Sequence, residues 1–192
     1  MYYSWDIVEL INQGNHCVQA TLTCGLTPRV LGQYQSEWLP KLRAVGAEDA
    51  HWDWQLYWNN YRNDSSQLFF ALECESKLQG MQWLSASGYA SRLTHSPKIV
   101  YIQRLCAAPW NRGKSSQRLF RPVGMVLLRN AVLKSIEVGF NGRIGLHSLA
   151  GAAHWYRDTL RLTGFGPDPE HEGLEYFEFT EEQARRLLRL NE

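Results

Sequence analysis

The sequence has no excess of charge and no long apolar run. Its 20 lysines and arginines and 19 aspartates and glutamates give a formal net charge of +1, which provides no general attraction for nucleic acid or an anionic membrane. No apolar run approaches the roughly 20 residues of a membrane-spanning helix. The first residues, with Asp6 and Glu9 among them, lack the basic segment of a secretory signal. We expect a soluble, cytoplasmic protein with no membrane partner, and the near-neutral charge disfavours nucleic acid as a partner.

The sequence has only four cysteines, and none of them are spaced as a metal-binding or redox motif would require. Cys17, Cys24, Cys74 and Cys106 show no C-x-x-C arrangement, and two of them fall inside apolar, strand-like runs. This pattern favours buried free thiols over disulfides or zinc ligands. We therefore expect no metal site.

Two catalytic motifs are incomplete. Residues 112–115 (RGKS) contain the end of a P-loop, but residue 108, where its first glycine would stand, is alanine, and helical spacing begins only near Pro122. The sequence also has no G-x-S-x-G nucleophile elbow. Nucleotide hydrolysis and serine-hydrolase chemistry are therefore disfavoured.

What is present suits one compact domain. At 192 residues, with 44% hydrophobic and 12% aromatic content, the chain can bury a sizeable core. Apolar periodicity and turn residues predict strands over residues 2–11, 16–22, 68–75, 81–93, 98–107, 143–148 and 174–179. They predict helical segments over residues 28–40, 48–61, 122–137 and 150–160, and a last helix after a capping box at Thr180. This order indicates an α/β fold with a mixed sheet, including an antiparallel meander over residues 68–107.

The most informative stretch runs from Lys98 to Glu137. An apolar strand, a loop and a helix follow one another, with Pro122 at the first helical position. Arg118, Arg121 and Gly124 stand at the helix entrance. Free N–H groups, the positive end of the helix dipole and two arginines make an anion site that suits a phosphate or pyrophosphate.

The same stretch resembles the acyl-CoA-binding motif of the GNAT (GCN5-related N-acetyltransferase) superfamily. In that motif a strand ending in V-x-P leads through Q/R-x-x-G-x-G/A into a helix. Residues 107–109 (AAP) correspond to the strand end and residues 121–124 (RPVG) to the loop, with a leucine pair at 127–128. Pro122 stands where a glycine is usual and Leu119 where Gln or Arg is usual. Because proline has no N–H, it removes one backbone contact to the ligand.

A second block, residues 142–165, is also similar to the family. Residues 152–156 (AAHWY) correspond to the first part of its A-x-x-F-Y-x-x-x-G-F pattern, whereas the Gly-Phe pair comes three residues late. The resemblance covers about residues 68–180. It implies a single GNAT-like domain over residues 1–192, with a mostly antiparallel mixed sheet flanked by helices.

The resemblance further implies an acyl-CoA-dependent N-acyltransferase. Acetyl-CoA would be the cosubstrate, and acetyl would pass directly to a primary amine of a small molecule or protein. Two alternative functions stay open: a non-catalytic acyl-CoA-binding or regulatory module, and a GNAT enzyme acting on protein or aminoacyl-RNA. Whether the protein forms a homodimer also stays open. The residues expected to bind the cofactor are Leu105, Cys106, Ala107, Arg118, Arg121, Val123, Gly124, Met125, Ser148 and Ala152.

For catalysis, the resemblance implies that Tyr156 protonates the departing thiolate. The strand over residues 98–107 contains no carboxylate, although many GNAT enzymes place a glutamate base there. Other groups must then be considered as the base: Glu73, Glu75, Asp53 or water. His147 and His154 are further acid/base candidates, although a histidine held by the backbone is the commoner outcome.

The segment over residues 48–61 is rich in aromatic side chains, among them Trp52, Trp54 and Trp58. At helical spacing such residues are mostly core. In the GNAT arrangement this region borders the acceptor, and aromatic faces attract a cationic amine. Both interpretations stay open.

Overall fold

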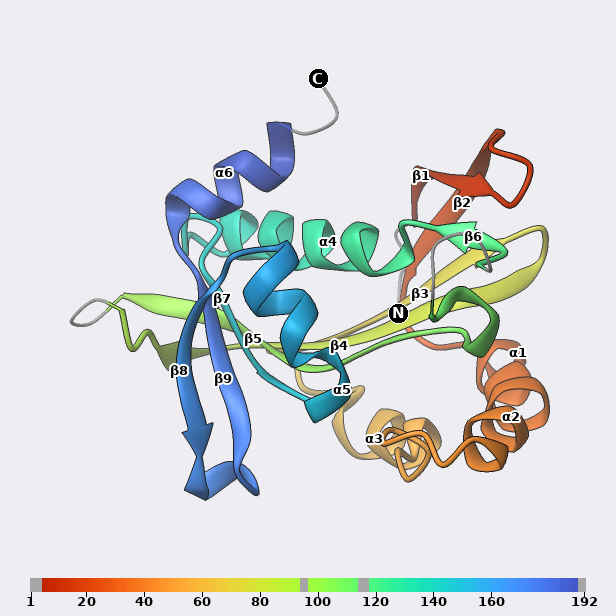
Figure 1. Cartoon of the computed structure of the whole chain (residues 1–192), viewed down its shortest axis with the longest axis horizontal. Helices are drawn as coiled ribbons and strands as arrows, with labels where there is room; N and C mark the ends of the chain where they lie inside the picture. The colour runs from red at the N-terminus through yellow and green to blue at the C-terminus, as the bar shows by residue number, and fades with distance from the viewer. Residues whose placement is uncertain (1–4, 94–96, 114–117, 190–192) are drawn as a thin grey trace. The chain divides into compact units, whose positions relative to one another are not determined.

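The computed structural model describes residues 5–93, 97–113 and 118–189. The chain forms two compact units, Met1–Trp83 with Arg104–Leu127 and Leu84–Gln103 with Leu128–Glu192. Strands β4 and β5 and helix α4 contribute residues to both units (Figure 1). Among the described residues, no helix combines the length and apolar character needed to cross a bilayer. A single functional domain over residues 1–192 stays a prediction.

The strands are β1 (Trp5–Asn12), β2 (Cys17–Cys24), β3 (Gln67–Cys74), β4 (Lys77–Ala90), β5 (Lys98–Ala107), β6 (Phe120–Arg121), β7 (Ile144–Ser148), β8 (Thr163–Asp168) and β9 (Leu174–Phe179). The helices are α1 (Pro28–Gln33), α2 (Leu39–Ala44), α3 (Trp54–Tyr61), α4 (Val123–Glu137), α5 (Ala150–His154) and α6 (Glu181–Arg189). Most strand pairs are antiparallel and β5–β7 is parallel, which confirms the mixed, mostly antiparallel α/β fold.

In the first unit, the strand order is β6-β1-β2-β3-β4. Strands β1 and β2 form a hairpin in which Leu10 lies opposite Val18, and β1 also pairs with β6 through Ile11 and Arg121. The strands predicted over residues 2–11 and 16–22 are these two. The sequence did not predict β6, because a two-residue strand carries no periodic signal.

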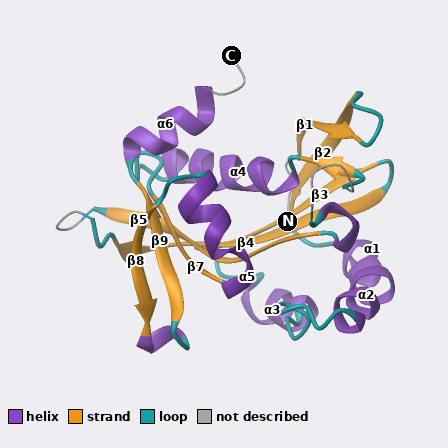
Figure 2. Ribbon diagram, viewed as in Figure 1, coloured by secondary structure: helices purple, strands orange, loops and turns teal. Residues whose placement is uncertain are grey.

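Two helix boundaries differ from the predictions. The first helical segment continues past Pro40 to Ala44 (Figure 2), because a π-helical turn over Tyr34–Trp38 accommodates the proline. Within that turn the Leu39 N–H bonds to the Tyr34 carbonyl, five residues back. Helix α3 begins at Trp54 rather than Glu48, since the Asp53 carboxylate accepts the Leu56 N–H at 2.9 Å and caps it.

In the second unit, β5 and β7 are parallel, with Val100 beside Ile144, and β9 pairs antiparallel with both β7 and β8. Figure 1 shows β8 and β9 as one hairpin. The sequence did not predict β8, because its segment TGFGPD contains two glycines and a proline. The strand tolerates them through a register irregularity between Gly164 and Pro167. The capping box is confirmed, since Thr180 and Gln183 exchange hydrogen bonds of 2.8 and 3.1 Å.

Candidate functional site

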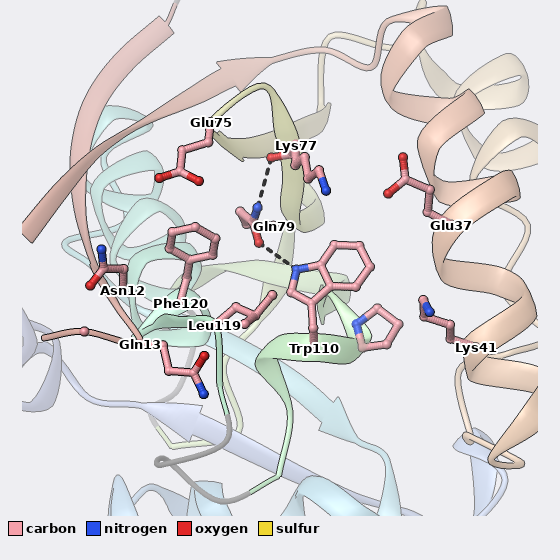
Figure 3. Close-up of a pocket in the computed structure, with 12 residues that line it drawn as sticks. Asn12, Gln13, Glu37, Lys41, Glu75, Lys77, Gln79, Trp110, Leu119 and Phe120 are labelled. Atoms are coloured by element: carbon pink, nitrogen blue, oxygen red, sulfur yellow. Dashed lines mark hydrogen bonds between the residues drawn. The ribbon is translucent and has the colours of Figure 1, made fainter. Parts of the chain in front are cut away.

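The loop between β5 and α4 is fixed at its base by one buried amide. The Gln79 Oε1 of β4 accepts hydrogen bonds from Trp110 Nε1 at 3.0 Å and Asn111 Nδ2 at 2.8 Å. The Asn111 Oδ1 in turn accepts the Phe120 N–H at 2.9 Å. Figure 3 shows the Gln79 amide between Lys77 and the Trp110 indole. Trp110 and Asn111, at the start of the loop, are therefore bound to β4, and Phe120, at its end, is bound to Asn111.

A buried ion pair holds the end of β5. Both Nη atoms of Arg112 bond to the Asp49 carboxylate at 2.8 and 2.6 Å, and its Nε donates to the Ala107 carbonyl at 2.8 Å. The sequence predicts neither this pair nor the role of Gln79, because the bonded partners lie 63 and 32 positions apart. No local pattern marks such contacts.

Helix α4 begins directly against β4, and Gly80 permits this close approach. A Cβ at Gly80 would lie 2.9 Å from Val123 Cγ1, 3.0 Å from Leu127 Cδ1 and 3.4 Å from the Cys106 carbonyl oxygen. The first intrahelical bonds come from Met125 and Val126, which both donate to the Pro122 carbonyl. The N–H groups of Val123 and Gly124 precede those bonds and lie at the positive end of the helix.

Other predicted cofactor residues lie around this helix start. Leu105, Cys106 and Ala107 end β5, and burial raises the pKa of the Cys106 thiol, so this thiol stays protonated. The two predicted arginines contact their own chain. Arg118 donates to the Gly113 carbonyl at 2.9 and 2.6 Å, and Arg121 donates to the Asn15 side chain. Both guanidinium groups thus stabilise the loop and the neighbouring hairpin. The residues of the incomplete P-loop, Lys114 and Ser115, lie outside the described residues.

A pocket of about 790 Å³ adjoins the loop base within the first unit (Figure 3). Its apolar wall consists of Pro109, Trp110, Leu119 and Phe120. Its polar rim consists of Asn12, Gln13, Glu37, Lys41, Glu75, Lys77 and Gln79. The volume is that of a small-molecule site, and both ends of the loop contribute to its wall.

Glu73, the candidate base on β3, forms an ion pair with Arg29 at 2.6 Å. Asp53 caps α3. The three tryptophans of the aromatic segment, Trp52, Trp54 and Trp58, are buried in the core, whereas Tyr61 is 40% exposed. The aromatic faces of the segment also meet a cation from the chain itself, because the Arg104 guanidinium carbon lies 5.1 Å from the Trp52 ring centroid.

The second unit contains a buried polar cluster around His147. The Tyr101 hydroxyl lies 2.6 Å from His147 Nδ1, and His147 Nε2 lies 3.0 Å from Asp168 Oδ2. Arg92 donates to the same carboxylate oxygen at 2.5 Å. The His171 ring stacks on that of His147 with centroids 3.8 Å apart. The sequence identified His147 but none of these four neighbours as functional candidates.

The charges in this cluster follow from its hydrogen bonds. The Arg92 guanidinium, and next the His147 N–H, lower the pKa of Asp168 well below its usual range. Burial lowers the pKa of His147 below 6.5, although Asp168 opposes that shift. At neutral pH the cluster therefore contains a carboxylate beside a neutral imidazole.

His147, Asp168 and His171 also place three potential ligand atoms within 4.8 Å of one another. Arg92 already bonds to Asp168 Oδ2, however, and the two imidazoles are stacked face to face. A metal ion must lie in the plane of each imidazole that binds it, and two parallel rings cannot both satisfy this. The cluster is a hydrogen-bonded ion pair.

A second carboxylate, Glu178, completes the polar layer. It accepts hydrogen bonds from the Tyr176 hydroxyl at 2.8 Å, the Ser91 hydroxyl at 2.6 Å and the Arg92 N–H at 2.5 Å. The Tyr176 hydroxyl reaches this position because β7 carries Gly145, where a Cβ would lie 2.5 Å from it. The buried carboxylate is thus satisfied by three donors.

The remaining predicted residues also lie in the second unit. Tyr156 is buried in a π-helical turn after α5, with its ring 5.7 Å from that of Phe177. Burial raises the pKa of this phenol, so it stays protonated at neutral pH. The Ser148 hydroxyl donates to the Leu149 carbonyl, and Ala152 lies in α5.

Comparison with known proteins supports the fold. No protein-family model matches the chain, and no curated protein matches it in sequence. Among solved structures, the GNAT domain of S. lividans PAT is 10% identical, with 90% of this chain and 96% of that chain covered and a TM-score of 0.58. A protein from Desulfovibrio desulfuricans assigned to the GNAT acetyltransferase family is 11% identical, with 84% and 99% covered and a TM-score of 0.54. A bacterial toxin is 13% identical, with 98% and 97% covered and a TM-score of 0.56. The chain therefore has the GNAT fold.

Proposed function

Starting from this fold, we propose that the protein is an acyl-CoA-dependent N-acyltransferase that transfers acetyl from acetyl-CoA directly to a primary amine. The observation that carries the proposal is the start of α4, which lies against β4 at Gly80 and follows a loop fixed at its base. Fixed N–H groups at a helix N-terminus are suited to a pyrophosphate. Solved structures with this fold include N-acetyltransferases.

In this proposal the N–H groups of Val123 and Gly124 bind the pyrophosphate of CoA. Pro122 has no N–H, and the two arginines at the loop contact their own chain. We assign the main binding to the helix start, and Arg118 and Arg121 stay proposed phosphate contacts besides holding the loop in place. The backbone at the end of β5, residues 105–107, supports the pantetheine arm.

Transfer forms one bond and breaks another. The amine nitrogen attacks the thioester carbonyl, the C–N bond forms, and the C–S bond breaks when the tetrahedral intermediate collapses. The nitrogen loses a proton, and the CoA thiolate gains one. We assign the second proton to Tyr156, since its raised pKa keeps it available as a donor. Glu73, which forms an ion pair with Arg29 at 2.6 Å, stays a candidate base for the first proton.

Two measurements test the proposal. Calorimetry should detect binding of acetyl-CoA, and a thiol assay should detect free CoA when amines such as spermidine and phenethylamine are added. Cys17 is an exposed free thiol, so the assay should use a Cys17→Ser variant to lower its background. Absence of binding would refute the proposal. Binding without release of CoA by any amine would favour the non-catalytic alternative.

A further inference from the structure

Three hydrogen-bonded side chains, Tyr101, His147 and Asp168, link β5, β7 and the end of β8 in the second unit. We propose that they are the relay that takes the proton from the acceptor amine, with the Tyr101 hydroxyl as the group that meets the amine. This inference rests on the acyltransferase function proposed above. It assigns a base to the deprotonation of the amine.

The hydrogen bonds fix the position of each proton. Asp168 is ionised, because Arg92 and His147 both donate to it. The proton on His147 must therefore be on Nε2, 3.0 Å from the carboxylate. The Nδ1 lone pair then faces the Tyr101 hydroxyl at 2.6 Å, so the phenol donates and the imidazole accepts. This is the arrangement in which a proton can move inward from the phenol.

The proton passes from the amine to the imidazole in two coupled transfers. A proton leaves the amine nitrogen for the Tyr101 oxygen as the proton of Tyr101 passes to His147 Nδ1. No net charge builds up on the phenol, and the positive charge comes to the imidazole beside the Asp168 carboxylate. Exchange with solvent after product release restores the neutral imidazole. Carboxylate stabilisation of an imidazolium is the role that an aspartate has in hydrolytic triads.

The surroundings of His147 keep it ready to accept a proton. The titratable and charged groups around it on the packed elements are Arg92, Tyr101, Asp168, His171 and Tyr176, and Tyr176 in turn donates to Glu178. Burial, and the positive charges of Arg92 and of His171 when it is protonated, disfavour the imidazolium, while Asp168 favours it. The result is a pKa below 6.5, and the free base predominates at neutral pH.

The relay is desolvated but close to solvent. The side chains of His147 and Asp168 are only 5% and 6% exposed, whereas the Tyr101 ring packs at a tilt against that of Tyr89, which is 45% exposed. Tyr89 accepts a hydrogen bond from Gln103 at 3.2 Å. Low dielectric strengthens proton coupling along such a chain.

The test compares Tyr101→Phe with the matched control Tyr89→Phe, since each removes one phenolic hydroxyl and keeps a ring. With acetyl-CoA and spermidine or phenethylamine, in buffer with EDTA, we expect kcat of Tyr101→Phe to fall by about 10²- to 10⁴-fold. The KM for acetyl-CoA should stay within a few-fold, and Tyr89→Phe should keep the wild-type rate. A wild-type rate for Tyr101→Phe would overturn the relay and leave the acyltransferase proposal standing.

The pH dependence separates proton transfer from a structural role. The wild-type rate should fall as pH drops through the pKa of His147, which lies below 6.5, because the protonated ring cannot accept. Asp168 is a positioning residue that raises this pKa, so Asp168→Asn should shift the acid limb to lower pH and reduce the maximal rate. An unshifted limb would show that Asp168 acts only on the fold, and would overturn the relay.

Nitrogen NMR of the histidine rings provides a readout independent of turnover. At neutral pH we expect His147 to carry its proton on Nε2, and Tyr101→Phe to change the Nδ1 shift. A proton on Nδ1 in the wild type would overturn the relay. Loss of activity in EDTA that Zn²⁺ restores would also overturn it, since a metal would then occupy the cluster. If the wild type binds acetyl-CoA but acetylates no amine, both proposals fail together.

Discussion

The close approach at Gly80 gives the sharpest quantitative prediction. In Gly80→Ala the new Cβ would lie 2.9 Å from Val123 Cγ1 and 3.0 Å from Leu127 Cδ1, too close for carbon atoms. Overpacking of this kind costs about 1–3 kcal/mol, and the lower entropy of the unfolded alanine chain offsets about 0.4–1 kcal/mol. We expect a net loss of about 1 kcal/mol in the free energy of unfolding. Displacement of the helix start should also weaken acetyl-CoA binding.

A double-mutant cycle with Val123→Ala tests this reasoning. Val123→Ala alone should cost about 1.6 kcal/mol, because it removes two buried methyl groups. Since it also removes the clashing Cγ1, the double variant should be more stable than the sum of the single losses by about 1 kcal/mol. Denaturant unfolding and calorimetry with acetyl-CoA provide the measurements. Gly32→Ala is the control, because a Cβ there meets nothing within 4 Å. Additive losses, or an unchanged Gly80→Ala, would refute the argument.

Three further predictions concern single positions. Gly124→Glu should weaken acetyl-CoA binding by more than about tenfold, or roughly 1.4 kcal/mol, because it places a negative charge at the helix start. Gly124→Gln, which is uncharged, should weaken binding less. Calorimetric affinities that are equal for the wild type and Gly124→Glu would contradict this. Tyr156→Phe should reduce kcat by about 10²- to 10⁴-fold with little change in stability or acetyl-CoA affinity; a wild-type rate would eliminate it as the acid. Gly145→Ala should destabilise the fold by about 3 kcal/mol, as its Cβ would lie 2.5 Å from the Tyr176 hydroxyl, and Tyr176→Phe should relieve part of the loss in denaturant unfolding.

The sequence predicted those parts of the fold whose signals are local. Strands β5 and β9 have the predicted bounds, because runs of β-branched and aromatic residues stand between clear turns. Helix α4 starts one residue after Pro122, as expected from proline at a helix start. Strand β8 was missed because its glycines and proline are typical of loops. Pairing with β9 stabilises it, and that contact is invisible in the segment itself.

The site was less predictable, because its contacts are long-range. Tyr101 lies inside an apolar run, where an aromatic residue is normally core, and Asp168 ends an irregular strand. Only the fold brings them to His147, over 46 and 21 positions. At Arg121 the motif predicts a phosphate contact, which stays a prediction, whereas the contact of its guanidinium with the Asn15 side chain of the β1–β2 turn has no local signal.

The hydrogen bonds at the loop base make one side chain, Asn111, sensitive to chemical ageing of the purified protein. Its Nδ2 donates to Gln79 Oε1 at 2.8 Å, and its Oδ1 accepts the Phe120 N–H at 2.9 Å. Hydrolysis of this amide to a carboxylate would remove the donor and set two acceptor oxygens against each other. Deamidation at this one position would therefore loosen both bonds that Asn111 makes at the base of the loop.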